Sequence, residues 1–172
     1  MIDFLTHQPA ASYLRAAALI VTLGMGVYLS VLGKPLEKTG HGILALELAW
    51  TKDRAERIVR SWSAVKDVAI KQVRWDFVFI AGYAVLLFFI ALTTEQAAAT
   101  AGYARLAYVA RLAAWGGLLA GVLDCLENIG LLVMLSGSIT SATVLATSIC
   151  AGVKFALAIF VLALAGLTFV LV

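Results

Sequence analysis

Charged residues, prolines, cysteines and histidines are all scarce in this sequence. Of its 172 residues only 13% are charged, and there are two prolines, two cysteines and two histidines. Soluble domains carry about 25% charged residues, so this composition excludes an ordinary soluble fold. The cysteines, Cys125 and Cys150, have neither Cys-X-X-Cys nor zinc-finger spacing, which indicates small apolar residues and not a redox pair or a metal site.

Long apolar runs dominate the chain instead. Hydrophobic residues make up 63% of it, and its mean hydropathy is +0.99. A membrane-spanning helix needs about 20 mostly apolar residues. Four stretches meet that requirement, at about 13–32, 75–92, 107–135 and 144–172. Since no internal repeat or linker divides the chain, it is predicted to be an all-α polytopic membrane protein, a four-transmembrane-helix bundle with a single membrane domain over 1–172.

The basic residues are distributed unevenly between the predicted loops. Nine of the 13 Lys and Arg lie between the first two spans: Lys34, Lys38, Lys52, Arg54, Arg57, Arg60, Lys66, Lys71 and Arg74. By the positive-inside rule this segment is cytoplasmic, and both termini and the loop around Glu95 are periplasmic. We expect no cleavable signal peptide, because no basic region precedes the first span, which runs into Gly33-Lys34-Pro35.

The segment between the first two spans, about 41–74, has two parts. From Ala55 to Val73 apolar residues recur at helical spacing, which predicts an amphipathic helix on the cytoplasmic membrane surface. Its basic residues would attract anionic lipid headgroups, whereas its interleaved acids argue against nucleic acid as a partner. The preceding stretch, Gly40 to Trp50, is too short to span and fits a re-entrant or interfacial segment. It either carries Glu47 toward the membrane or leaves that carboxylate in water.

Polar residues inside the third predicted span are the strongest functional indication. Asp124, Glu127 and Asn128 interrupt an otherwise apolar run. An ionised carboxylate in the middle of a membrane costs at least about 2.5 kcal/mol, so such a group normally faces a partner, a cavity or a ligand. Gly117 and Gly121 share a helical stripe with Asp124 and Asn128, which predicts that a neighbouring helix packs against this face.

Lys154 is the only charged residue in the fourth predicted span. The third and fourth spans are joined by the short turn 136–141, so they should be antiparallel neighbours. Counting outward from this turn at the helical rise places Lys154 at nearly the same depth as Asp124. The sequence therefore predicts an ion pair between Lys154 and either Asp124 or Glu127.

Asp76 and Tyr83 share a face of the second predicted span, because they are seven residues apart. Asp76 either caps the start of that helix or turns inward to join the other acids. In the second case four acids face Lys154 alone, and a bound cation, a proton or a cationic ligand must balance them. The alternative is a satisfied buried network that only fixes helix register. The predicted pocket comprises Glu47, Asp76, Asp124, Glu127, Asn128 and Lys154, with Tyr83 and His41 as secondary members.

The candidate metal ligands in the sequence are carboxylates and not histidines. His41 is near the predicted pocket and His7 lies in the outer tail, which excludes a multi-histidine site. No cofactor is identified, and a metal held by these carboxylates would be a hard divalent cation such as Mg²⁺, Ca²⁺ or Mn²⁺.

Three short motifs resemble a group of small bacterial four-span membrane proteins whose activity is uncharacterised. They are Gly42-Ile43-Leu44-Ala45-Leu46-Glu47-Leu48-Ala49, Trp75-Asp76-Phe77 and Leu123-Asp124-Cys125-Leu126-Glu127-Asn128. The resemblance implies a multi-pass protein of the bacterial inner membrane and implies that the acids of the three motifs belong together. It implies no substrate or cofactor.

Three functions from different classes fit these patterns. The first is an intramembrane acidic pocket, open to the cytoplasmic side, that binds a cation, a proton or a polar ligand for transport or sensing. The second is an enzyme acting on a lipid or isoprenoid headgroup, with Asp124 or Glu127 as general acid or base. The third is a non-catalytic subunit whose Gly and Ala faces form a homo-oligomer or dock a larger membrane complex. A shared cavity favours the first two functions, and a gap-free apolar interior favours the third.

Overall fold

The protein is an all-α bundle in a computed structural model that describes residues 9–172. Its helices are α2 (Pro9–Glu37), α3 (Ile43–Glu47), α4 (Lys52–Ser61), α5 (Lys66–Thr100), α6 (Ala104–Leu135) and α7 (Ser141–Leu171). Four of them, α2, α5, α6 and α7, are long and apolar enough to cross a membrane. By helix length and hydropathy the chain is therefore a multi-pass membrane protein, which confirms the predicted four-helix architecture.

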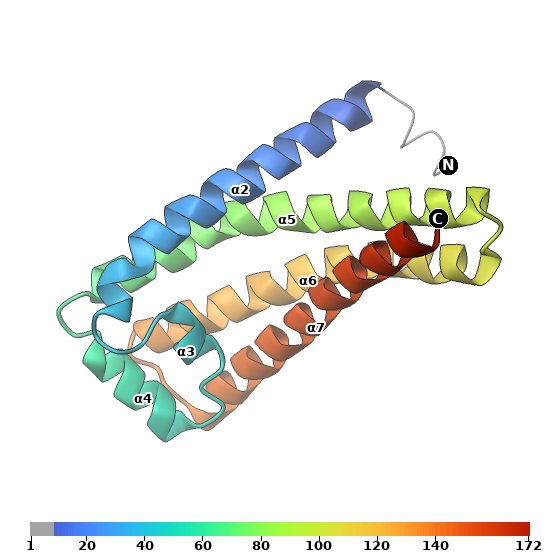
Figure 1. Cartoon of the computed structure of the whole chain (residues 1–172). Helices are drawn as coiled ribbons and strands as arrows, with labels where there is room; N and C mark the ends of the chain where they lie inside the picture. Colours follow the sequence, from blue (N-terminus) through green and yellow to red (C-terminus); the bar gives the residue numbers. More distant parts are fainter. Residues whose placement is uncertain (1–8) are drawn as a thin grey trace.

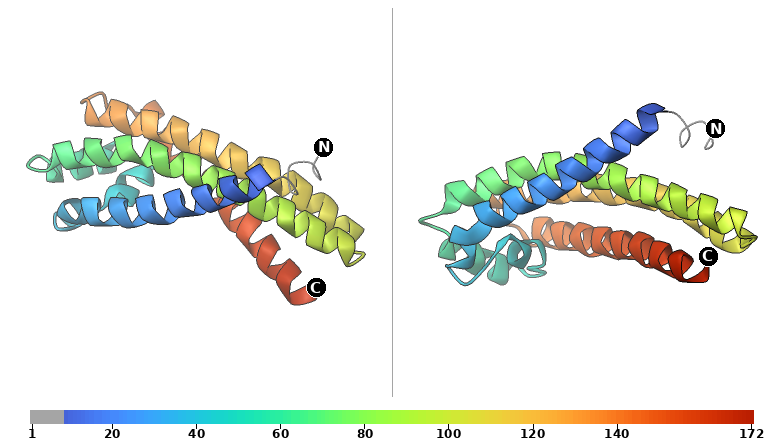
Figure 2. Two further views of the ribbon diagram at one scale, coloured as in Figure 1. Left: turned by 90° about the horizontal axis from the view of Figure 1, so that it is seen from above. Right: turned by 45° about the horizontal axis from the view of Figure 1, so that its top comes forward.

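The antiparallel helices α5 and α6 form the centre of the bundle (Figure 1). Helix α2 packs along α5, and α7 packs along α6 with a smaller contact to α5. The short helices α3 and α4 lie together at the end of the bundle where α2 ends and α7 begins. Two further views show α2 and α7 diverging from the central pair toward the opposite end (Figure 2).

Close contacts at glycines explain how the central helices fit together. A Cβ added at Gly121 would lie 2.7 Å from the Ala84 Cβ of α5, and one added at Gly117 would lie 2.9 Å from the Leu87 Cβ. These positions therefore let α5 and α6 approach closely, as the small-residue spacing predicts. Gly130 has the same role toward α7, because a Cβ there would collide with the Thr147 hydroxyl.

The helices extend beyond the predicted spans, and one predicted helix is divided in two. Helix α5 begins at Lys66, so Asp76 lies ten residues inside it and the capping alternative for Asp76 is wrong. The amphipathic helix predicted from Ala55 to Val73 is interrupted between α4 and α5. Trp62 lies at this interruption, fully buried, and its indole N–H donates to the backbone carbonyl of His41 at 2.9 Å. Periodicity alone does not show this tertiary contact.

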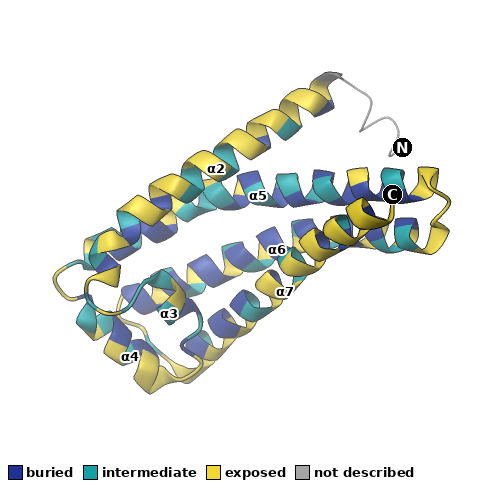
Figure 3. Ribbon diagram, in the orientation of Figure 1, coloured by how far each residue is buried: buried dark blue, intermediate teal, exposed yellow. Residues whose placement is uncertain are grey.

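The outward faces of the long helices are apolar and exposed (Figure 3). Helix α2 exposes Leu23 and Val27, and α7 exposes Ile159 and Phe160. A bilayer would cover such faces with lipid chains. Glu95, predicted in a periplasmic loop, instead lies within α5, where it is buried and pairs with Arg111 at 2.6 Å.

Candidate functional site

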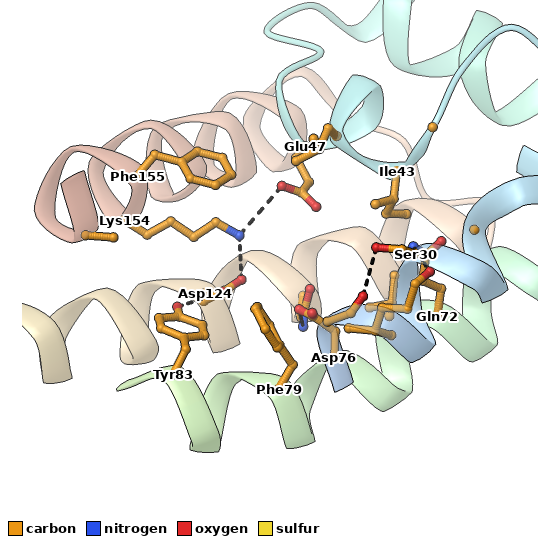
Figure 4. A pocket seen from close by; sticks show the side chains of 18 of the residues that line it. Ser30, Ile43, Glu47, Gln72, Asp76, Phe79, Tyr83, Asp124, Lys154 and Phe155 are labelled. Carbon is orange, nitrogen blue, oxygen red and sulfur yellow. Dashed lines mark hydrogen bonds and ion pairs between the residues drawn. The ribbon is translucent and has the colours of Figure 1, made fainter. Parts of the chain in front are cut away.

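Lys154 lies at the centre of a buried cluster of acids (Figure 4). Its Nζ is 2.6 Å from Asp124 Oδ1, 2.8 Å from Glu127 Oε2 and 3.6 Å from Glu47 Oε2. Each of these four side chains is less than 10% exposed. The predicted pairing of Lys154 with Asp124 or Glu127 is confirmed, and both acids take part.

The position of Glu47 depends on the short helix α3. This helix folds back over the bundle between α2 and α4 and places the Glu47 carboxylate above Lys154. Glu47 is 7% exposed, so the alternative in which it faces water is wrong. Through this contact α3 packs against the long helices of the bundle.

Two residues of α5 face the same cluster from the other side. The Tyr83 hydroxyl donates to Asp124 Oδ2 at 2.7 Å, so Asp124 is held by both Tyr83 and Lys154. About two turns before Tyr83 on α5, Asp76 accepts a hydrogen bond from Asn128 Nδ2 at 2.8 Å. Asp76 and Tyr83 thus share the inward face of α5, as their spacing predicts.

A cavity of about 490 Å³ connects most of these groups. It is bounded by α2, α3, α5, α6 and α7, and its polar lining residues are Ser30, Glu37, Glu47, Gln72, Asp76, Tyr83, Asp124, Asn128 and Lys154. Glu127 is not on its wall but reaches it through the contact with Lys154. The volume is in the range that holds a small-molecule ligand. The bundle interior is therefore neither apolar nor gap-free.

Sequence patterns alone did not identify Gln72 as a wall residue. It is 9% exposed, its Nε2 donates to the Leu29 carbonyl of α2 at 3.3 Å, and its Oε1 has no hydrogen-bond partner among the described residues. Gln72, Asp76, Phe79 and Tyr83 are spaced by four, three and four residues, so they form one face of α5. This spacing is the feature of the sequence that places Gln72 on the same helix face as Asp76 and Tyr83.

The charge of the cavity is strongly unbalanced. Of the described residues that line it, Lys154 is the only basic one, against Glu37, Glu47, Asp76 and Asp124, and Glu127 adds a further acid beside it. Burial raises the pKa of Glu47 above its usual value of 4.5, although the Lys154 ammonium acts in the opposite direction. The site therefore favours protons or other positive charge.

His41 is not a wall residue of this cavity. Its backbone carbonyl accepts the indole hydrogen bond of Trp62, and its Nδ1 is buried without a hydrogen-bond partner among the described residues. His7 lies outside the described residues. Within residues 9–172, no group of three or more His, Cys, Asp or Glu side chains has an arrangement that could hold a metal ion.

Comparisons with protein-family models, with curated proteins and with solved structures find no match to this chain.

Proposed function

We propose that this protein binds a positively charged guest, a cation, a proton or a cationic ligand, in its intramembrane acidic cavity, for transport or for sensing. The observation that carries the proposal is the charge of the cavity. Glu47, Asp124 and Glu127 share one Lys154 ammonium. Asp76 lines the same cavity, and within residues 9–172 its side chain has only the neutral Asn128 as a hydrogen-bond partner.

The depth of the cluster makes this charge imbalance costly. Asp124 is 11 residues from the end of α6 and Lys154 is 13 residues from the start of α7, which correspond to about 16 and 20 Å at the helical rise. Both groups would thus lie near the middle of a hydrocarbon layer about 30 Å thick. Uncompensated carboxylates persist there only if they take up protons or if a positive group binds.

The cellular setting is part of the proposal. We place the chain in a bacterial inner membrane with both termini periplasmic, which puts α3, α4 and the α3 side of the cavity toward the cytoplasm. The exposed basic side chains of α4, Lys52, Arg54, Arg57 and Arg60, support contact with anionic lipid headgroups on that side. The motif resemblance to small bacterial four-span proteins supports the same location.

The presence of the cavity also distinguishes between the three candidate functions. A non-catalytic subunit that docks only through small-residue faces has no need for a polar cavity of this size. An enzyme acting on a lipid headgroup would use the same cavity, and it too would first have to bind a guest there. Binding is therefore the function that the geometry supports best.

The proposal is tested by thermal unfolding of the purified chain in a nonionic detergent, across pH and with added alkali, ammonium and organic cations at constant ionic strength. A guest present at 100 times its Kd adds about 2.7 kcal/mol, which raises the melting temperature by several degrees. We expect the rise to be lost in Asp76→Asn and kept in Asp67→Asn, the same substitution at an exposed site of α5. Identical responses of both variants and the wild type to every cation and pH would contradict the proposal.

A further inference from the structure

We propose that the guest is an amphiphile whose headgroup is an ammonium with N–H donors and whose alkyl chain lies between α2 and α7. This inference rests on the proposed function and specifies its ligand class. It is carried by two unpaired hydrogen-bond acceptors on α5, by the hydrogen bonds that the nearby donors already make, and by an apolar extension of the cavity.

The unpaired acceptors are on Gln72 and Asp76, one helical turn apart on α5. The Gln72 side chain is nine-tenths buried on the cavity wall, and its Oε1 has no partner among the described residues. Its orientation is fixed, because the Leu29 carbonyl accepts from Nε2 and would repel Oε1. Asp76 also lines the cavity, and it accepts from Asn128 through Oδ2, whereas its Oδ1 accepts no hydrogen bond among the described residues. A guest that satisfies both groups must bring donors.

The donors near these acceptors are already used inside the protein. The Asn128 amide donates to Asp76, the Tyr83 hydroxyl donates to Asp124, and the Lys154 ammonium is surrounded by three carboxylates. An anionic guest such as a phosphate would meet mainly acceptors of like charge. A primary ammonium offers three N–H donors and a positive charge, which match Gln72 and Asp76.

The rest of the wall is apolar and leads toward α2 and α7. Leu29 and Gly26 of α2, Phe79 of α5, and Phe155 and Ala158 of α7 line it. Helix α2 packs on α5 and helix α7 packs on α6, but α2 and α7 make no extensive contact with each other, and residues of both line the cavity. An alkyl chain can therefore extend from the polar end of the cavity toward the lipid-facing side of the bundle.

Three probes that differ in one property each test this ligand class. Dodecylammonium has N–H donors and a chain, dodecyltrimethylammonium has the chain and the charge without N–H donors, and ethylammonium has the donors without the chain. Each is titrated at a low mole fraction in detergent micelles that hold the purified full-length chain, with the melting temperature as readout. We expect dodecylammonium to stabilise at a concentration roughly tenfold or more below the other two, because a quaternary group leaves the buried Gln72 Oε1 unpaired.

Variants assign the effect to the two acceptors. Gln72→Met keeps the side-chain volume and should bring the two dodecyl probes to similar affinities, whereas Asp76→Asn should weaken both. Asp67 is exposed on the same helix, so Asp67→Asn should bind the probes like the wild type. It serves as the control for non-specific effects of amphiphiles on the melting temperature. If Gln72→Met does not fold, the inference is decided by whether the wild type binds dodecylammonium more tightly than dodecyltrimethylammonium.

A lipid and a free amine are distinguished by a further arm with phosphatidylethanolamine and phosphatidylcholine. Stabilisation by phosphatidylethanolamine, and its competition with dodecylammonium, would assign an amine-headed lipid, whereas a response to dodecylammonium alone would assign a free long-chain amine. Equal binding of primary and quaternary probes that is lost in Asp76→Asn would overturn this inference and leave the proposed function intact. The absence of any Asp76-dependent response to the three probes and to inorganic cations would overturn both.

Discussion

At the scale of single residues, the contact of the Lys154 ammonium with three carboxylates is the defining feature of this protein. One ammonium within 3.6 Å of three carboxylates cannot neutralise them all, so the excess acids need protons or a bound positive group. A buried ion pair is weak evidence for stability, because apolar packing can often replace it. Removing one partner alone is different, since it leaves the remaining charges buried and unpaired.

Lys154→Met is therefore expected to destabilise the protein by about 3 to 5 kcal/mol under conditions in which Asp124 and Glu127 stay ionised. The triple variant Lys154→Met, Asp124→Asn, Glu127→Gln should recover much of this loss, because it removes the orphaned charges. Chemical denaturation in detergent measures both. A triple variant that is less stable than Lys154→Met would show that the ion pairs themselves stabilise the bundle.

The stability contributed by Glu47 should depend on pH in a defined direction. Since burial raises the pKa of Glu47, the folded protein holds this proton more tightly than the unfolded chain does. The contribution is fully present below the usual pKa of 4.5 and is lost as the pH rises through the raised value. We expect the wild type to lose stability relative to Glu47→Gln as the pH rises from 4.5 into the neutral range. The melting temperatures of both proteins, with the exposed Asp53→Asn as control, measure this, and parallel pH profiles would contradict it.

Some of these residues could be predicted from the sequence and others could not. The pairing of Lys154 with Asp124 follows from the short turn between their helices, because helical rise converts residue counts into depth. The sequence does not determine whether Glu47 is buried, because its burial depends on how α3 folds back against the bundle. The sequence does not single out Gln72, because a neutral amide near the start of an apolar stretch carries no charge that would mark it as part of a site.

At the scale of helices, the α5–α6 contact positions the two halves of the site. Asp76 and Tyr83 on α5 reach Asn128 and Asp124 on α6 because small residues keep these helices close. The small-residue spacing of α6 predicted a close neighbour without identifying α5 as that neighbour. The division between α4 and α5 was not predicted, because the apolar periodicity continues through the turn that Trp62 anchors.

Gly121→Ala is expected to destabilise the bundle by about 1 to 3 kcal/mol, the usual cost of overpacking, because its Cβ would lie 2.7 Å from the Ala84 Cβ. Gly24→Ala is the matched control: no atom lies within 4 Å of an added Cβ there, and alanine favours the helix by about 0.5 to 1 kcal/mol. The compensating variant Ala84→Gly, Gly121→Ala should restore stability. Melting temperatures in detergent measure all three. Equal effects of Gly121→Ala and Gly24→Ala would contradict close packing at this position.

At the scale of the whole molecule, hydropathy determined the fold class and the approximate spans. Four long apolar helices can satisfy their backbone hydrogen bonds internally, which is why such runs predict a helical bundle. The exact helix ends were less predictable, since α2 continues through Pro35 to Glu37 and α5 begins well before its apolar part. Helix packing also does not report which face of a membrane the α3–α4 end occupies, so the orientation stays a prediction from charge.

We predict that the α3–α4 end is cytoplasmic, because nine of the 13 basic residues precede or begin α5 on that side. Cysteine accessibility in a bacterial inner membrane measures this, in a background in which Cys125 and Cys150 are replaced by alanine. Ser63→Cys lies in the exposed turn between α4 and α5, and Thr100→Cys lies at the exposed far end of α5. An impermeant thiol reagent applied from the periplasm should label Thr100→Cys and not Ser63→Cys, with the reverse pattern in inside-out vesicles. Labelling of Ser63→Cys from the periplasm would show that the topology is the reverse of the predicted one. The α3 side of the cavity would then face the periplasm.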